Sequence, residues 1–244
     1  MNTRVVNIKV GRSKEIMGTL IDPGADHRSP AILFIHGWQG NRNKYVTLAE
    51  TIFARCGFVC LAIDLEGHGE SSGKIESVSR ENNFNDVLAA YDYLQKLPQV
   101  NENRITVIGS SYGGYLAMLL AGVRRPAQLV LRAPALYRDA GFALPTKQAI
   151  AGLSDYRTRA VQAGRNKALS ALRTFQGDAL IIAGSEDEDV PLQTIQNVKR
   201  ALANSRSQKI EIILGADHRL SQELWREYCN STMKAWVIEK QGVV

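Results

Sequence analysis

Short apolar runs that alternate with segments of helical spacing are the feature that most constrains the fold of this chain. Eight such runs occur: Val5–Val10, Ile16–Ile21, Ala31–Ile35, Phe58–Ile63, Ile105–Ile108, Leu129–Leu131, Ala179–Ala183 and Ile210–Leu214. From the third onward they show little alternation between apolar and polar residues, which is typical of strands buried on both faces of a parallel sheet. The first two alternate more, and we interpret them as an antiparallel hairpin at one edge of that sheet.

Helical patterns separate most of these runs. They cover about Arg42–Arg55, Asn82–Leu97, Tyr112–Val123, Leu192–Ala203 and Ser221–Glu239. In the second, apolar residues follow the spacing of a stripe that faces a core, at Phe84, Val87, Leu88, Tyr91 and Leu94. Strands joined by such helices predict an α/β fold with helices on both faces of the sheet. In folds of this class the active site lies at the carboxyl ends of the strands.

Composition narrows the class of protein. The 244 residues are 45% apolar and carry a formal net charge of +6, as expected of a globular chain. With no internal repeat or linker composition, they predict a single domain over residues 1–244. No apolar run is long enough for a membrane helix, and the first residues lack the pattern of a secretory signal. The odd cysteine count (Cys56, Cys60 and Cys229) favours a reduced, cytoplasmic protein.

The run Ile105–Ile108 leads directly into the pattern G-x-S-x-G, with glycines at 109 and 113 and Ser111 between them. A strand, an abrupt turn and a helix in this order are the context in which the pattern marks a nucleophile. Glycine on both sides leaves room for the strained turn. The helix N-terminus beneath Ser111 favours a developing negative charge. Ser111 is therefore the candidate nucleophile.

Other motifs follow other strand ends in a fixed order. They are His36-Gly37-Trp38, the loop Asp64–Ser71 (D-x-x-G-H-G-x-S), the turn Gly184–Pro191 (G-x-x-D-x-x-V-P), and His218 after the last run. Together with the serine motif, they make residues 30–235 resemble the α/β-hydrolase family. The resemblance implies a mostly parallel eight-stranded sheet with helices on both faces and a small lid insertion at about residues 135–177. Within that insertion we expect helical stretches around Lys147–Leu153 and Arg157–Leu172.

The resemblance also implies roles for individual residues. The backbone N–H groups of Trp38 and Tyr112 would form the oxyanion hole, while His36 would be a structural, hydrogen-bonded histidine. In the loop Asp64–Ser71, His68 would belong to the loop architecture. Family members often carry arginine where this chain has Glu66, a departure expected to alter pairing in the loop.

In the same family the acid follows a late strand and the base follows the last one. The turn motif places the acid at Asp187, with Asp189 as its nearest competitor in the sequence. His218 falls at the position of the base, and neighbouring Asp217 is interpreted as a surface residue or one that begins the last helix. The order Ser111, Asp187, His218 is the order of a catalytic triad in this fold.

These residues predict a serine hydrolase that forms an acyl-enzyme and requires no metal or organic cofactor. The short lid favours a carboxylesterase that acts on small or short-acyl esters. Alternatives within enzymes are an aminoacyl-peptidase-like activity and hydrolysis of aryl, cinnamoyl-type esters. An alternative of another class is a noncatalytic hydrolase-fold protein that binds a ligand. The sequence leaves the oligomeric state open.

The positive charge gathers in the lid. Between residues 137 and 176 seven basic residues face only Asp139 and Asp155; they are Arg138, Lys147, Arg157, Arg159, Arg165, Lys167 and Arg173. Two hypotheses follow. These side chains attract anionic esters to the entrance of the site, or they form a solvated helix face. The first predicts that neutralising Arg157, Arg159 and Arg165 raises KM for anionic esters most. No motif of a nucleic-acid-binding fold accompanies the charge.

Overall fold

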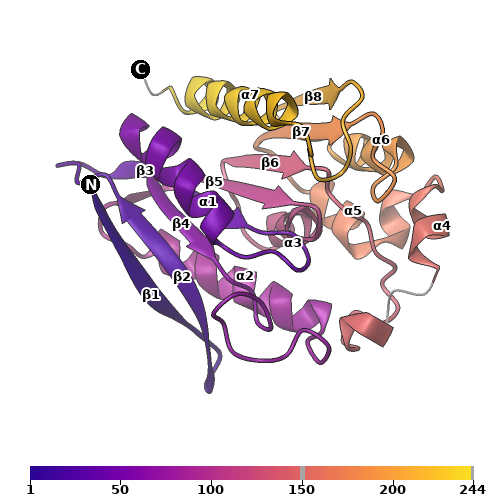
Figure 1. Cartoon of the computed structure of the whole chain (residues 1–244), viewed down its shortest axis with the longest axis horizontal. Helices are drawn as coiled ribbons and strands as arrows, with labels where there is room; N and C mark the ends of the chain where they lie inside the picture. The colour runs from indigo at the N-terminus through magenta and orange to yellow at the C-terminus, as the bar shows by residue number, and fades with distance from the viewer. Residues whose placement is uncertain (149–151, 243–244) are drawn as a thin grey trace.

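Eight strands form one sheet in the order β1-β2-β4-β3-β5-β6-β7-β8 (Figure 1). The computed structural model describes residues 1–148 and 152–242. The strands are β1 (Asn2–Val10), β2 (Lys14–Asp22), β3 (Ser29–Ile35), β4 (Val59–Ile63), β5 (Val100–Ser110), β6 (Gln128–Arg132), β7 (Asp178–Gly184) and β8 (Ser207–Ile213). All eight apolar runs therefore lie in or across strands, and the predicted α/β-hydrolase fold is confirmed.

The edge hairpin is also confirmed. β1 pairs antiparallel with β2, β2 pairs antiparallel with β4, and the pairs from β4 to β8 are all parallel. β3, β4 and β7 are buried along their whole length. The expectation of burial on both faces is wrong for β8, where only Ile213 is buried, because β8 has a neighbouring strand on one side only.

Helices cover both faces of the sheet and divide the interior into two cores. The helices are α1 (Asn43–Leu48), α2 (Arg80–Gln95), α3 (Tyr112–Ala121), α4 (Leu153–Arg157), α5 (Lys167–Leu172), α6 (Leu192–Ala201) and α7 (Glu223–Gln241). One core contains side chains of α2, α3, α5 and α6, and the other contains side chains of α1 and α7. Alternation along β3 supplies both: Leu33 and Ile35 face the first core, Ile32 and Phe34 the second.

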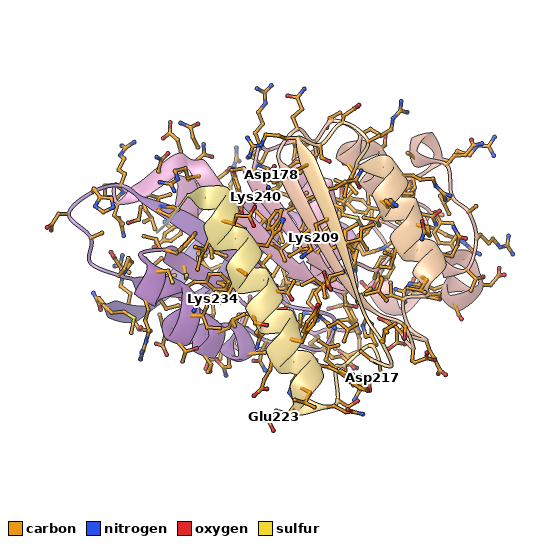
Figure 2. All side chains as sticks on the ribbon, turned by 90° about the horizontal axis from the view of Figure 1, so that it is seen from above. Asp178, Lys209, Asp217, Glu223, Lys234 and Lys240 are labelled. Carbon is orange, nitrogen blue, oxygen red and sulfur yellow. The ribbon has the colours of Figure 1, made fainter. Side chains whose placement is uncertain are left out.

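The region between β3 and β4 differs from the single helix expected over Arg42–Arg55. After α1 the chain continues as a π-helical turn, η1 (Ala49–Phe53), and a 3-10 turn, η2 (Ala54–Cys56). Gly57, with a φ of 82°, ends this segment and allows the chain to enter β4. On the same face α7 lies across the sheet, with Glu223 at its first turn and Lys240 near its end (Figure 2).

The lid segment, 135–177, follows β6 and returns to β7. The single helix expected over Arg157–Leu172 is wrong, because α4 ends at Arg157 and only η4 (Ala163–Arg165) and α5 follow. The side chain of Asn166 caps α5 by accepting a hydrogen bond from the Leu169 N–H, at 3.1 Å, and so starts a new helix. Of the helix expected over Lys147–Leu153, residues 149–151 lie outside the described residues, and η3 (Thr146–Gln148) precedes them.

Arg80 fastens the start of the lid to α2. Its guanidinium is fully buried and donates to the carbonyl oxygens of Arg138, at 2.7 Å, and Ala140, at 3.0 Å. The same guanidinium lies 5.2 Å from the ring centre of Tyr137 and 5.9 Å from that of Tyr115. In the described ranges 1–148 and 152–242, no helix is long and apolar enough to cross a membrane.

Candidate active site

Ser111 occupies a strained turn between β5 and α3. Its φ is 52° and its ψ is −111°, and the helix begins at the next residue. A Cβ atom added at Gly109 would lie 2.4 Å from the Gly113 carbonyl oxygen, and one added at Gly113 would lie 2.2 Å from the Ile35 carbonyl oxygen. Only glycine therefore fits at either side of the serine, which explains both glycines of the G-x-S-x-G pattern.

The structure brings Ser111, His218 and Asp187 into one hydrogen-bonded chain. His218 Nδ1 lies 2.7 Å from Asp187 Oδ2, and His218 Nε2 lies 3.0 Å from Ser111 Oγ. Because a carboxylate only accepts, Nδ1 carries the proton, and Nε2 accepts from the Ser111 hydroxyl. The other oxygen of Asp187 accepts from the Val190 N–H at 2.7 Å, and the carboxylate is almost entirely buried. Its orientation toward the imidazole is thus fixed from both sides.

The two neighbouring aspartates do not join this chain. Asp189 is exposed at the rim of the site, and its carbonyl oxygen accepts from the guanidinium of Arg157 at 2.7 Å. Asp217 accepts from the backbone N–H of Ser221 at 2.9 Å, just before α7 begins. Figure 2 shows Asp217 in the loop near the first turn of α7. Of the two candidate acids in the sequence, only Asp187 contacts His218.

Trp38 and Tyr112 lie together beside Ser111, with their rings in edge contact and the ring centres 5.3 Å apart. The Tyr112 N–H is the first of α3 and has no intrahelical acceptor. Among the described residues, the Trp38 N–H has no acceptor either. Of the two side chains, only that of Trp38 lines the cleft. Tyr112 is fully buried, and its hydroxyl donates to Asn83 Oδ1 at 3.0 Å.

Both ring nitrogens of His36 make hydrogen bonds to the backbone, which is typical of a structural histidine. Its Nε2 accepts from the Leu65 N–H at 3.1 Å, so Nδ1 carries the proton and donates to the Gly37 carbonyl oxygen at 2.7 Å. Burial lowers the pKa of His36 to about 4, and the nearby His68 contributes in the same direction. His68 is likewise buried, with Nδ1 3.0 Å from the Glu66 carbonyl oxygen. Neither histidine contacts Ser111.

The loop Asp64–Ser71 is held by a buried ion pair that the sequence motif did not reveal. Asp64, fully buried, accepts from the Arg42 guanidinium, from the Arg42 N–H at 2.7 Å and from the Glu70 N–H at 2.9 Å. Arg42 also donates to Glu70 Oε2 at 2.5 Å. Glu66, where the family often has arginine, pairs instead with Lys14 at 2.8 Å.

A cleft of about 850 Å³ opens over Ser111 and His218. Among the described residues that line it, four are cationic and one, Asp189, carries a carboxylate; the cations are Lys44, Arg132, Arg157 and Arg219. Only Arg157 belongs to the lid. Arg159 pairs on the surface with Asp155, and neither Arg159 nor Arg165 lines the cleft. Of the three lid arginines named for the first hypothesis, only Arg157 therefore lines the cleft, and the exposed Arg159 and Arg165 fit the second hypothesis, a solvated face.

Sequence reasoning missed Lys44, Arg132 and Arg219, although one signal was available. Arg132 ends an apolar strand, and Arg219 follows the candidate base, both at the carboxyl edge where sites form in this fold. In the ranges that the structure describes, no three His, Cys, Asp or Glu side chains are grouped as metal ligands.

Comparison with known proteins relates this chain to one protein family and to longer relatives. The model of the family described as serine aminopeptidase, S33, matches residues 26–176. An uncharacterized protein of Mycobacterium tuberculosis is 27% identical over 192 residues, which cover 78% of this chain but only 63% of that protein.

Two solved structures share the fold across nearly the whole chain. Est1E of Butyrivibrio proteoclasticus, solved with ferulic acid bound, has a TM-score of 0.75 at 20% identity, covering 96% of this chain and 98% of its own. The esterase Pf2001 of Pyrococcus furiosus has a TM-score of 0.73 at 19% identity, covering 98% and 93%. Because the family match spans more than half of the chain, this protein belongs to the family described as serine aminopeptidase, S33, and it has the α/β-hydrolase fold.

Proposed function

We propose that this protein is a serine carboxylic-ester hydrolase that acts on small or short-acyl esters through Ser111, His218 and Asp187. The observation that carries the proposal is the hydrogen-bonded chain from Asp187 through His218 to Ser111, with distances of 2.7 and 3.0 Å, facing the cleft. A cleft of about 850 Å³ has the size of a site for a small molecule.

His218 Nε2 removes the hydroxyl proton as Ser111 Oγ attacks the ester carbonyl carbon. Asp187 keeps the proton of the imidazole on Nδ1 and stabilises the imidazolium without taking that proton. The N–H groups of Trp38 and Tyr112 donate to the oxyanion. His218 then protonates the departing alcohol, and a water molecule attacks the acyl-enzyme in the same way. The products are a carboxylic acid and an alcohol.

Two other enzyme activities remain candidates, each for a specific reason. The matched family is described as serine aminopeptidase, which favours cleavage of aminoacyl amides. Est1E, similar in fold, was solved with ferulic acid, and the aromatic side chains of Trp38, Tyr45 and Tyr137 line the cleft here, which favours aryl esters. The short lid and the esterase neighbours favour simple esters over both. Three free cysteines suit a reducing compartment such as the cytoplasm.

Replacement of the nucleophile tests the proposal. Ser111→Ala is expected to abolish labelling by a fluorophosphonate probe and to lower turnover of a short 4-nitrophenyl ester roughly 10⁶-fold. A parallel panel compares short esters, cinnamoyl-type esters and aminoacyl amides. Faster cleavage of amides would replace the esterase assignment. Failure of the folded wild-type protein to react with the probe would favour a noncatalytic ligand-binding protein.

A matched pair of aspartates tests the acid. Asp187→Asn removes the acceptor for Nδ1–H and is expected to lower turnover about 10⁴-fold. Asp189→Asn, the same change two residues away, is expected to leave turnover close to the wild-type value, since that carboxylate does not contact His218. The reverse result would assign the acid to Asp189.

A further inference from the structure

Three residues lie where the catalytic cleft meets a second, smaller cavity. Lys44, Tyr45 and Arg132 line both the cleft and a cavity of about 190 Å³ between α1 and α7. The walls of the small cavity include the apolar side chains of Leu48 and Met233. We call the meeting point of Lys44, Tyr45 and Arg132 the cationic junction.

Arg132 is held at the junction by neutral groups. It ends β6, next to the strand that carries the nucleophile, and is half-buried. Its Nε donates to Ser110 Oγ and its Nη1 donates to the His218 carbonyl oxygen, both at 2.5 Å. Within the described part of the chain, Nη2 makes no hydrogen bond and no carboxylate lies within 4.0 Å of the guanidinium. Its positive charge is therefore not neutralised by the protein.

Lys44 brings a second positive charge to the same point. Desolvation lowers the pKa of its ammonium, and the charges of Arg132 and Arg226 lower it further. Arg226, which lines the small cavity, donates to the carbonyl oxygens of Leu220 and Ser221 at 2.8 and 2.6 Å. Lys44 and Arg226 are exposed and Arg132 is half-buried, so water screens part of the repulsion between these cations, and a bound anion would offset the rest.

We propose that the cationic junction binds a carboxylate and that the substrate is an ester carrying one. The inference rests on the proposed function and names its substrate class. A guanidinium fixed at Nε and Nη1 offers Nη2 to a ligand oxygen, and the Lys44 ammonium supplies a second charged donor. The hydrocarbon that separates the carboxylate from the ester then lies in the cleft between the junction and Ser111, where the rings of Trp38 and Tyr45 are part of the lining.

The carboxylate can lie on either side of the scissile bond, and two pairs of esters distinguish the sides. On the acyl side, the mono-4-nitrophenyl ester of adipic acid is compared with that of adipamic acid, its neutral amide. On the alcohol side, the butyrate ester of 6-hydroxyhexanoic acid is compared with that of its amide. In at least one pair, the wild-type protein is expected to prefer the carboxylate about tenfold in kcat/KM, as for a hydrogen bond to a charged group.

Three variants locate the origin of that preference. Arg132→Gln and Lys44→Gln are each expected to reduce it to threefold or less, whereas a purely structural role would lower both esters of a pair equally. Arg165→Gln, which removes the same charge from an exposed lid residue outside the cleft, is expected to leave it unchanged. Equal rates within both pairs for the wild-type protein, or an unchanged preference in both junction variants, would overturn the proposal.

A binding measurement separates this proposal from the proposed function. Calorimetry with Ser111→Ala protein compares monomethyl adipate with the methyl ester of adipamic acid. Tighter binding of the carboxylate, lost in the Ser111→Ala, Arg132→Gln double variant, supports the junction even if the wild-type protein hydrolyses none of the four esters. Equal affinity for the two compounds overturns it, whatever the turnover.

Discussion

Two arginines near the carboxyl edge of the sheet have opposite surroundings. Arg42 is 5% exposed and pairs with the carboxylates of Asp64 and Glu70, whereas Arg132, as far as the described residues go, donates only to a hydroxyl and a carbonyl. A buried charge with partners is part of the scaffold, since its removal leaves another charge unpaired. A charge without a carboxylate beside a catalytic cleft is available to a ligand. The comparison separates cations that are paired within the fold from cations that line the cleft without a carboxylate partner among the described residues.

The largest effect on stability is expected from breaking the buried ion pair between Arg42 and Asp64. Asp64→Asn leaves Arg42 buried without its nearest charge, and we expect the free energy of unfolding to fall by about 3–5 kcal/mol. Urea denaturation measures the change. Asp92→Asn provides a matched control, because Asp92 pairs with Arg124 on the surface and its loss is expected to cost about 0–1 kcal/mol. Equal losses of unfolding free energy in Asp64→Asn and Asp92→Asn would contradict the distinction between the buried ion pair and the surface one.

Protonation of His36 is expected to have the next largest effect. Folding lowers its pKa from 6.5 to about 4, so the folded state binds fewer protons than the unfolded state between these values. The resulting stability is complete above pH 6.5 and is lost as the pH falls toward 4, by about 3 kcal/mol. The main physical reason is burial, which removes water from around the charged imidazole; in addition, a proton on Nε2 would displace the Leu65 N–H from which that nitrogen accepts.

Urea midpoints between pH 4 and 7 test this expectation in the wild-type protein and in His36→Gln. The variant is expected to be less stable at pH 7 but to lose less stability on acidification. Asp86, whose pKa burial raises from 3.8 to about 6, acts with the opposite sign, since between these values the folded state binds more protons than the unfolded state and stability falls as the pH rises. It is present in both proteins, so the difference between their pH profiles isolates His36. Parallel profiles would be evidence against the assignment.

The smallest effect on stability is expected from binding of an anion at Arg132. Adipate at ten times its Kd is expected to raise the free energy of unfolding of the wild-type protein by about 1.4 kcal/mol, through linkage. The neutral diamide, and sodium chloride at equal ionic strength, are expected to have little effect. In Arg132→Gln the stabilisation by adipate is expected to disappear. Equal stabilisation of both proteins would mean that the anion binds elsewhere.

Much of the fold could be predicted because the relevant signals are local. The apolar runs identified all eight strands, and alternation in the first two placed a hairpin at the sheet edge. The helix over Arg157–Leu172 was wrong because tertiary contacts interrupt the pattern. Arg157 donates back to the Leu136 carbonyl oxygen at 3.2 Å, and Asn166 caps a new helix.

The candidate site likewise contains some residues that could be predicted from the sequence and others that could not. Ser111, Asp187 and His218 follow strand ends within recognisable motifs, so their convergence was expected before any contact was known. Arg132 carries no motif. Its environment depends on which residues β5 and the His218 loop place beside the end of β6, which no spacing in the sequence encodes. Likewise, whether a lid arginine faces the cleft depends on how the lid folds back.

The contact of Arg80 with the start of the lid joins two segments that are far apart in the sequence. Releasing the carbonyl oxygens of Arg138 and Ala140 would leave a buried guanidinium without its acceptors, so separating this part of the lid from α2 is expected to be costly. We therefore expect the start of the lid to keep its position when a ligand binds in the cleft, so that binding depends on a preformed shape and not on movement of this segment.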